Sequence, residues 1–281
     1  MTKIRGLAAI FGVLATLVSG GWVLRAQSSP DEKSYVGFDR NDYPGDANLA
    51  ALRKDFLFAG YWLNVPPGAT SNSWTGKRNV LRGAGFGFLV LFNGRLDAEL
   101  RKIKDVAQLG TTDAAEAVAA AQRESFPANT VIFLDVEEGG RMLAEQKAYI
   151  YAWVDHINDA GFRAGVYCSG IAAKEGKGVE VITAKDLREN ANGRKIVYWV
   201  VNDGCPPSPG CVLPKDSPSP ATALDFADVW QYSQSPKRRD VASGCRATYD
   251  RDGNCYTPAT RDKKLFLDLD AATSADPSGG R

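Results

Sequence analysis

The sequence has 281 residues, of which 44% are hydrophobic and 24% are charged, so it can bury a large core and is expected to be globular. Its 34 basic and 33 acidic residues give a net charge of +1 without a long basic block, which argues against nucleic acid as a partner. The single histidine, His156, lies within a helical pattern, which argues against Ser-His-Asp and Cys-His enzymes. We expect neither a metal nor a cofactor.

The amino terminus carries a targeting pattern. Lys3 and Arg5 precede an apolar run over residues 7–24, and a polar stretch follows. This order predicts a secretory signal peptide within residues 1–26, and therefore a secreted or periplasmic protein. The alternative is an uncleaved membrane anchor through residues 7–24, although a run of this length barely reaches across a bilayer.

The five cysteines are consistent with export. Cys205 and Cys211 bracket a loop rich in Pro and Gly, and Cys245 and Cys255 bracket a polar loop. Two short-range disulfides are therefore predicted, because oxidising compartments favour such pairs. Cys168 follows a run of strand character and is expected to be a buried thiol.

Strands and helices alternate from residue 35 onward. Strands are predicted over residues 35–39, 59–64, 86–92, 162–168, 195–201, 228–232 and 265–270, together with a central strand that starts at residue 131. Helical patterns lie between them over residues 47–58, 77–84, 97–109, 113–125, 145–160 and 183–189, the last of these with Thr183 as a candidate cap. Eight strands in about 240 residues predict a single α/β domain over residues 33–273, a (β/α)8 TIM-type barrel. A doubly wound open sheet is the second choice, and residues 274–281 are expected to be a disordered tail.

Acidic residues follow several of the predicted strands. Asp135 and Glu137 end the central strand and project to the same side, because side chains alternate along a strand. Asp39 ends the first strand, and Asp268 and Asp270 end the last. In a barrel these ends form one rim, where two close carboxyl groups would push their pKa values apart and perform acid and base chemistry. A capping Asp with solvated glutamates is the alternative interpretation.

Other residues at the same rim could bind sugars. Tyr167, Trp199 and Tyr232 could stack on sugar rings, or equally well pack the core beneath the loops. Gln231 lies beside Tyr232 at the end of the predicted seventh strand.

Six short motifs in order resemble the muramidase-type family 25 glycoside hydrolases. They are Gly37-Phe38-Asp39, Leu134-Asp135-Val136-Glu137, Gly165-Val166-Tyr167, Tyr198-Trp199, Val229-Trp230-Gln231-Tyr232-Ser233 and Leu267-Asp268-Leu269-Asp270. The first and last motifs are even more similar to a related group of secreted bacterial glycoside-hydrolase-like barrels, whose activity is not established.

The resemblance implies roles for individual residues. Glu137 matches the general acid/base and Asp135 its partner carboxylate, while Asp39 and Asp268 match acids that line the cleft. Asp270 departs from the usual Asn of that family and, with Tyr167, Trp199, Gln231 and Tyr232, is a candidate for substrate binding.

The implied activity is hydrolysis of β-1,4 bonds in cell-wall glycan, with peptidoglycan as the expected partner of a monomeric protein. Asp135 would either attack the anomeric carbon or orient the N-acetyl group of the substrate. A catalytically inactive barrel that binds cell-wall glycan is the main alternative, and a chitinase-like enzyme is the third.

Overall fold

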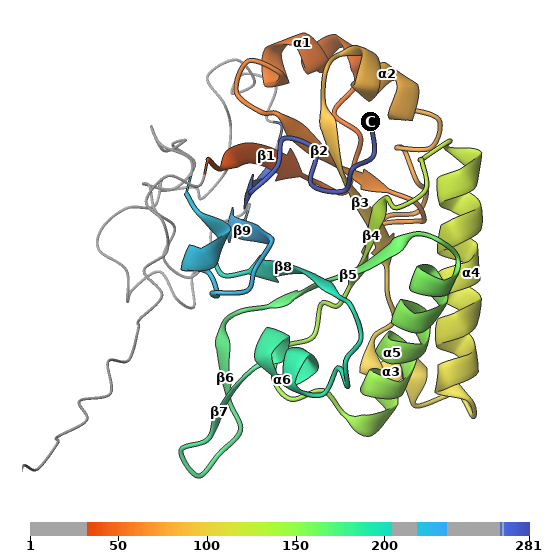
Figure 1. Ribbon diagram of the computed structural model, residues 1–281, viewed down its shortest axis with the longest axis vertical. Coiled ribbons are helices and arrows are strands. Elements are labelled where there is room, and N and C mark those ends of the chain that lie inside the picture. Colours follow the sequence, from red (N-terminus) through yellow and green to blue (C-terminus); the bar gives the residue numbers. More distant parts are fainter. Residues whose placement is uncertain (1–32, 204–217, 235–264, 266) are drawn as a thin grey trace, which may run out of the picture. The chain divides into compact units, whose positions relative to one another are not determined.

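Eight strands close into a barrel in the computed structural model, which describes residues 33–203, 218–234, 265 and 267–281 (Figure 1). The order around the barrel is β1-β10-β9-β8-β5-β4-β3-β2. The strands are β1 (Tyr35–Asp39), β2 (Phe58–Trp62), β3 (Gly87–Asn93), β4 (Val131–Asp135), β5 (Arg163–Ser169), β8 (Val197–Val201), β9 (Val229–Ser233) and β10 (Asp268–Ala272). The predicted TIM-type barrel is confirmed.

One strand of the barrel runs against the others. β10 is antiparallel to both of its neighbours, β1 and β9, whereas the other neighbouring strands of the barrel are parallel. The expectation that Asp268 ends a parallel strand is therefore wrong, because Asp268 begins β10. The antiparallel direction nevertheless brings this start to the rim where the parallel strands end, since Asp268 pairs with Asp39 of β1.

The helices differ from expectation mainly in their ends. They are α1 (Leu49–Leu52) after the short 3-10 helix η1 (Asp46–Asn48), α2 (Arg78–Gly83), α3 (Asp97–Leu100), α4 (Val106–Arg123), α5 (Ala144–Asp159), α6 (Thr183–Glu189) and the 3-10 turn η2 (Pro220–Thr222). α4 is one continuous helix, because the Asp105 side chain accepts a hydrogen bond from Gln108 N at 2.9 Å and starts it early. Thr183 is the first residue of α6 and not its cap.

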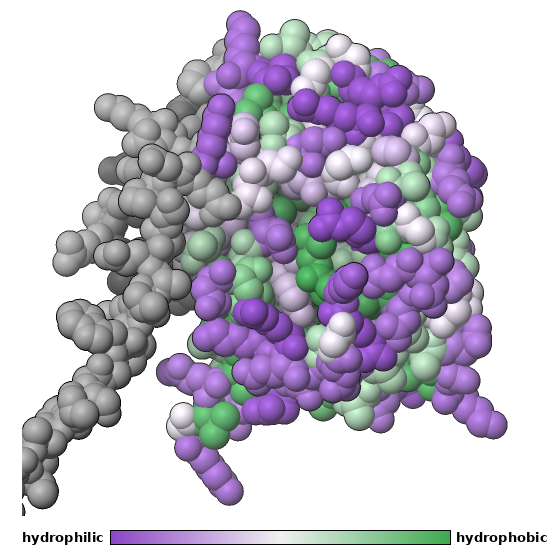
Figure 2. All heavy atoms as spheres, viewed as in Figure 1, coloured by the Kyte–Doolittle hydropathy of each residue, from purple (hydrophilic) through white to green (hydrophobic). Residues whose placement is uncertain are grey.

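α4 and α5 lie side by side outside the barrel (Figure 1). Gly110 of α4 permits the close approach, because a Cβ at this position would lie 2.3 Å from the carbonyl oxygen of Tyr149 in α5. No helix among the described residues is long and apolar enough to cross a membrane. Polar residues cover most of the face seen in Figure 2, with small apolar patches between them.

The end of the sequence is ordered, so the expectation of a disordered tail over residues 274–281 is wrong. Ser278 lies between the N-terminal ends of β3 and β4, which pair with each other only from Val90 and Ile132 onward. Its carbonyl oxygen accepts a hydrogen bond from Val131 N at 2.8 Å, and its Oγ accepts one from Val90 N at 2.9 Å. The tail therefore fills the gap between the two strands.

A buried arginine holds the tail from the other side. Arg78 of α2 donates from Nη2 and Nε to the carbonyl oxygen of Gly280, at 2.7 and 3.2 Å. Its guanidinium also lies over the ring of Phe126, 4.8 Å from the centroid. These contacts satisfy the charge of a side chain that water does not reach.

Candidate functional site

Four acidic side chains line one small cavity at the rim of the barrel. Asp39 ends β1, Asp135 ends β4, Glu137 follows two residues later, and Asp268 begins β10. The cavity has a volume of about 140 Å³. The structure therefore brings together four of the five acids that the sequence analysis placed at one rim, all but Asp270.

Two larger cavities meet the central one at Glu137. The first, of about 650 Å³, is lined by the loops that follow β2 and β3, including Asn64 and Arg95. The second, of about 450 Å³, is lined by β5 and by β6 (Ala172–Lys174). β6 forms a hairpin with β7 (Glu180–Ile182), which the sequence analysis missed. Glu137 is the residue that lines all three cavities, so it lies at the centre of an extended mouth.

Asp135 and Glu137 form a closely coupled pair of carboxyl groups. Asp135 is 3% exposed, and neither of its carboxylate oxygens receives a hydrogen bond from a donor group. Burial, and then the charge of Glu137, raise the pKa of Asp135 well above its ordinary value. Burial among the rim residues also raises the pKa of Glu137, although part of its surface stays exposed to solvent and its contact with Asp135 opposes the rise. The pair can therefore hold one proton between two carboxyl groups.

Asp39 is held by a chain of hydrogen bonds across the mouth. Gln231 donates from Nε2 to Asp39 Oδ2 at 2.8 Å, and Gln231 Oε1 accepts from the hydroxyl of Tyr167 at 2.7 Å and from Gln234 Nε2 at 3.0 Å. Burial raises the pKa of Asp39 to about 6, while the hydrogen bond from Gln231 opposes this rise. The chain fixes the orientation of Asp39 toward the cavity.

The candidates for substrate binding do not all reach the mouth. Tyr167 and Gln231 line the central cavity, and so does an edge of Trp199, which is otherwise packed against Tyr167 at 4.8 Å between ring centroids. Tyr232 is fully buried against Trp230 and lines none of the three cavities. We expected Tyr232 at the rim because it ends a predicted strand, but its side chain is enclosed in the core.

Asp270 is also enclosed. It is fully buried one step below the rim, where it pairs with Gly37 of β1 and accepts a hydrogen bond from Trp199 Nε1 at 3.1 Å. Its carboxyl group cannot touch a substrate directly. Gln234 is a lining residue that the sequence analysis missed, and its place directly after β9, three residues beyond Gln231, was the available signal.

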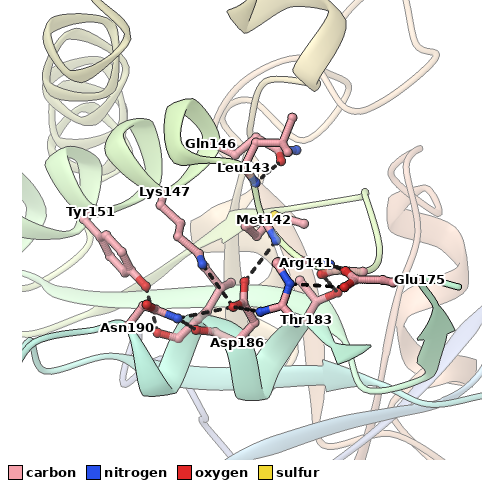
Figure 3. A network of polar contacts seen from close by, with 12 residues as sticks. Arg141, Met142, Leu143, Gln146, Lys147, Tyr151, Glu175, Thr183, Asp186 and Asn190 are labelled. Carbon is pink, nitrogen blue, oxygen red and sulfur yellow. Dashed lines mark hydrogen bonds and ion pairs between the residues drawn. The ribbon is translucent and has the colours of Figure 1, made fainter. Parts of the chain in front are cut away.

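The loop that follows Glu137 is tied to the β6-β7 hairpin (Figure 3). Arg141 donates from its backbone N to Glu175 Oε1 at 2.9 Å and from Nε to Glu175 Oε2 at 3.1 Å. Thr183 Oγ1 donates to the carbonyl oxygen of Gly140 at 3.0 Å. The hairpin wall of the mouth and the loop that carries Glu137 are therefore one connected structure.

A buried aspartate anchors the same loop to α6 (Figure 3). Asp186 is 4% exposed and accepts hydrogen bonds from Met142 N at 2.9 Å and from Lys147 Nζ at 3.0 Å. On the opposite side, a Cβ at Gly94 would lie 2.5 Å from the carbonyl oxygen of Asp135. The end of β4 is thus packed tightly from both sides, which keeps its acids in place.

The remaining predictions concern cysteines and metals. Cys205, Cys211, Cys245 and Cys255 lie outside the described residues, so their pairing remains a prediction. Cys168 is a buried free thiol, as expected, and burial raises its pKa to about 12. Within residues 33–203, 218–234, 265 and 267–281, no cluster of His, Cys, Asp or Glu could hold a metal ion.

Solved structures share this fold. An uncharacterized protein of B. stearothermophilus is 21% identical with a TM-score of 0.54, over 85% of this chain and 95% of that one. The Tat-secreted protein Rv2525c of Mycobacterium tuberculosis, solved with L-tartrate, is 14% identical with a TM-score of 0.51, over 84% and 94%. The spore cortex lytic enzyme SleM of Clostridium perfringens is 13% identical with a TM-score of 0.49, over 88% and 70%. At these identities the likeness shows the fold alone.

Sequence comparison identifies the family. No curated protein sequence matches the chain. The family model of the Rv2525c-like, glycoside hydrolase-like domain matches residues 70–225, which is more than half of the chain. This stretch contains β4 with Asp135 and Glu137, and the β6-β7 hairpin beside them. The chain belongs to the family of Rv2525c-like, glycoside hydrolase-like domains.

Proposed function

We propose that the protein is an extracytoplasmic glycoside hydrolase that cleaves β-1,4 bonds in cell-wall glycan, most directly peptidoglycan. The observation that carries the proposal is the coupled pair of Asp135 and Glu137 at the point where three cavities meet. A polymer that lies across the mouth would place one of its glycosidic bonds beside this pair.

Glu137 is suited to be the general acid. Its raised pKa keeps a proton available at a pH where an exposed glutamate has lost it, and its partial exposure allows contact with the leaving oxygen. Asp39 and Asp268 on the same cavity would stabilise the positive charge that develops on the sugar.

The closeness of Asp135 and Glu137 bears on which catalytic mechanism Asp135 would serve. The two side chains lie within hydrogen-bonding reach of each other, which leaves no room between them for the water molecule of an inverting pair. This supports a role in which Asp135 holds the proton of Glu137 and orients the N-acetyl group of the substrate.

The test is the release of reducing ends from purified cell walls. Glu137→Gln removes the proton donor with little change in shape, and the rate should fall about 10²–10⁴-fold. The matched control is Glu116→Gln, an exposed position on α4 far along the chain from the rim, which should leave the rate unchanged. Equal rates for wild type and Glu137→Gln would defeat the assignment.

Glycan binding without turnover is the second candidate function. It is favoured by the size of the central cavity, about 140 Å³, which is well below the ~300–1,000 Å³ typical of ligand pockets. Under this hypothesis the two flanking cavities would hold the glycan and the acids would only contact it. Wild type that sediments with cell walls but releases no reducing ends, with binding retained in Glu137→Gln, would establish this role.

A signal peptide or membrane anchor within residues 1–26 remains part of the proposal, as do the two disulfides, because both lie outside the described residues. Export would bring the mouth into contact with the cell wall. Detection of the mature amino terminus in culture medium or periplasm would test this.

A further inference from the structure

A second pair of carboxyl groups lies beneath the mouth. Asp270 of β10 is fully buried and Asp39 of β1 is 6% exposed, and their side chains are within hydrogen-bonding reach of each other. Asp39 faces the cavity, whereas Asp270 lies behind it, opposite Gly37. Only Asp39 can therefore contact a ligand.

The hydrogen-bond donors around this pair favour one proton between its two members. Trp199 Nε1 donates to Asp270 Oδ1 at 3.1 Å, and Gln231 Nε2 donates to Asp39 Oδ2 at 2.8 Å. Asp270 Oδ2 is buried and receives no hydrogen bond from a donor group. Two ionised carboxylates cannot satisfy each other, since both only accept hydrogen bonds. With one proton between them, the contact of Asp270 with Asp39 becomes a charge-assisted hydrogen bond.

The surroundings decide which of the two residues keeps the proton. The charged or titratable groups that act on Asp270 are Asp39, Asp268 and the phenol of Tyr232, all of which oppose a negative charge. Those that act on Asp39 are Asp270, Glu137, Asp135 and the phenol of Tyr167, but Asp39 also has the amide donor of Gln231. Burial, and then the charge of Asp39, raise the pKa of Asp270 well above its ordinary value, whereas that of Asp39 rises only to about 6.

We propose that Asp270 is a neutral carboxylic acid that donates a hydrogen bond to Asp39 and so positions Asp39 as a charged group facing the mouth. A carboxylic acid in a dry site can remain protonated at neutral pH and serve as a donor. Asp270 is thus a positioning residue, and its effect on hydrolysis rests on the proposed function. The proton that Asp270 shares with Asp39 does not depend on that function.

Two substitutions separate this role from simple packing. In Asp270→Asn the amide oxygen can accept from Trp199 and the amide nitrogen can donate to Asp39, so both hydrogen bonds are kept without a titrating group. In Asp270→Leu, of similar size, the donor to Asp39 is lost. The pKa of Asp39 should then rise by about one to two units, which is the usual worth of a hydrogen bond to a charged group.

The experiment is a carboxyl ¹³C NMR titration of the full chain labelled at aspartate, with circular dichroism as a check of folding. In wild type, the signal that disappears in Asp270→Asn should belong to an aspartate that is still protonated above pH 7, whereas a proton held by Asp135 should remain in both proteins. The Asp39 signal, assigned with Asp39→Asn, should titrate near pH 6 in both proteins and higher in Asp270→Leu. The proposal is overturned if the signal that is lost in Asp270→Asn belongs to an aspartate that is ionised at pH 7, or if Asp270→Asn raises the pKa of Asp39 by a unit or more. Because wild type and Asp270→Asn decide the question, a misfolded Asp270→Leu does not prevent a result.

Hydrolysis of cell walls then tests the functional consequence. The acid limb of the pH profile should move to higher pH in Asp270→Leu by as much as the Asp39 signal moves, and should stay in place in Asp270→Asn. An unmoved limb in a folded Asp270→Leu would overturn the positioning role. Absence of hydrolysis by every variant would instead count against the proposed function, and the NMR result would still decide the proton sharing.

Discussion

Replacing Asp39 by asparagine should stabilise the protein at neutral pH. Folding raises the pKa of Asp39 from an ordinary value of 3.8 to about 6, mainly because the side chain is buried. The folded state therefore holds this proton more tightly than the unfolded chain does. Its contribution to stability is complete below about pH 4 and is lost as the pH rises through about 6.

The magnitude follows from the two pKa values. The difference is about two units, and each unit corresponds to about 1.4 kcal/mol, so the ionised Asp39 costs about 3 kcal/mol of unfolding free energy above pH 6. Asp39→Asn carries no such cost, while its amide oxygen can still accept the hydrogen bond from Gln231. The variant should match wild type near pH 4 and exceed it by up to about 3 kcal/mol at pH 7.

Urea unfolding at pH 4, 5, 6 and 7 measures this difference. Asp159→Asn, at an exposed position at the end of α5, is the control and should change stability by less than about 0.5 kcal/mol at each pH. If the curves of wild type and Asp39→Asn run parallel from pH 4 to 7, or if the variant is the weaker at pH 7, the reasoning is wrong. A gain in stability with a loss of hydrolysis would fit an acid that is kept for function at a cost to folding.

Three further substitutions test the packing around the mouth and the tail. Gly94→Ala places a methyl group against the end of β4, so it should lower the free energy of unfolding by about 1–3 kcal/mol and should also slow hydrolysis. The control Gly83→Ala lies in open space on α2 and should raise the free energy of unfolding by about 0.5–1 kcal/mol. Ser278→Ala leaves a buried N–H of β3 without its acceptor and should cost about 1–3 kcal/mol in urea unfolding. Asp186→Ala removes the acceptor of Met142 N and Lys147 Nζ in the loop and helix beyond β4, and should lower the free energy of unfolding by about 3 kcal/mol. Arg141→Gln, at an exposed position, should lower it by less than about 1 kcal/mol.

Each of these has an outcome that contradicts it. Wild-type hydrolysis by Gly94→Ala would show that the acids of β4 do not depend on this close contact. Unchanged stability of Ser278→Ala would mean that the tail does not close the gap between β3 and β4. If Asp186→Ala and Arg141→Gln lowered the free energy of unfolding equally, the burial of Asp186 would not make its contacts more stabilising than those of the exposed Arg141.

The sequence allowed the barrel and its acidic rim to be predicted because both depend on local patterns. Apolar runs mark β3 and β4 as buried strands, and acids at the ends of β1 and β4 are visible without any structure. The direction of β10 was not predictable in this way. Apolar and acidic residues alternate in Leu267-Asp268-Leu269-Asp270, and this alternation is the same in parallel and antiparallel strands. Pairing with β1 decides it.

Long-range contacts account for the other misses. The composition of residues 274–281 is typical of a disordered tail, and it is the gap between β3 and β4, together with Arg78 of α2, that gives these residues partners. Tyr232 and Asp270 each follow a rim residue in a strand, so the pattern could not show that their side chains end in the core. The β6-β7 hairpin was missed because each strand has three residues, too few for a period to be seen.

β10 and the segment that follows it come after the other seven barrel strands in the chain, which has a consequence for synthesis. Residues 268–281 supply both the strand that joins β1 to β9 and the segment that joins the ends of β3 and β4. A nascent chain that lacks them has two open sheet edges and cannot complete its core, and such edges invite association with other chains. Cooperative folding must therefore wait until residues 268–281 have left the ribosome, and until then chaperones can hold the earlier strands unfolded.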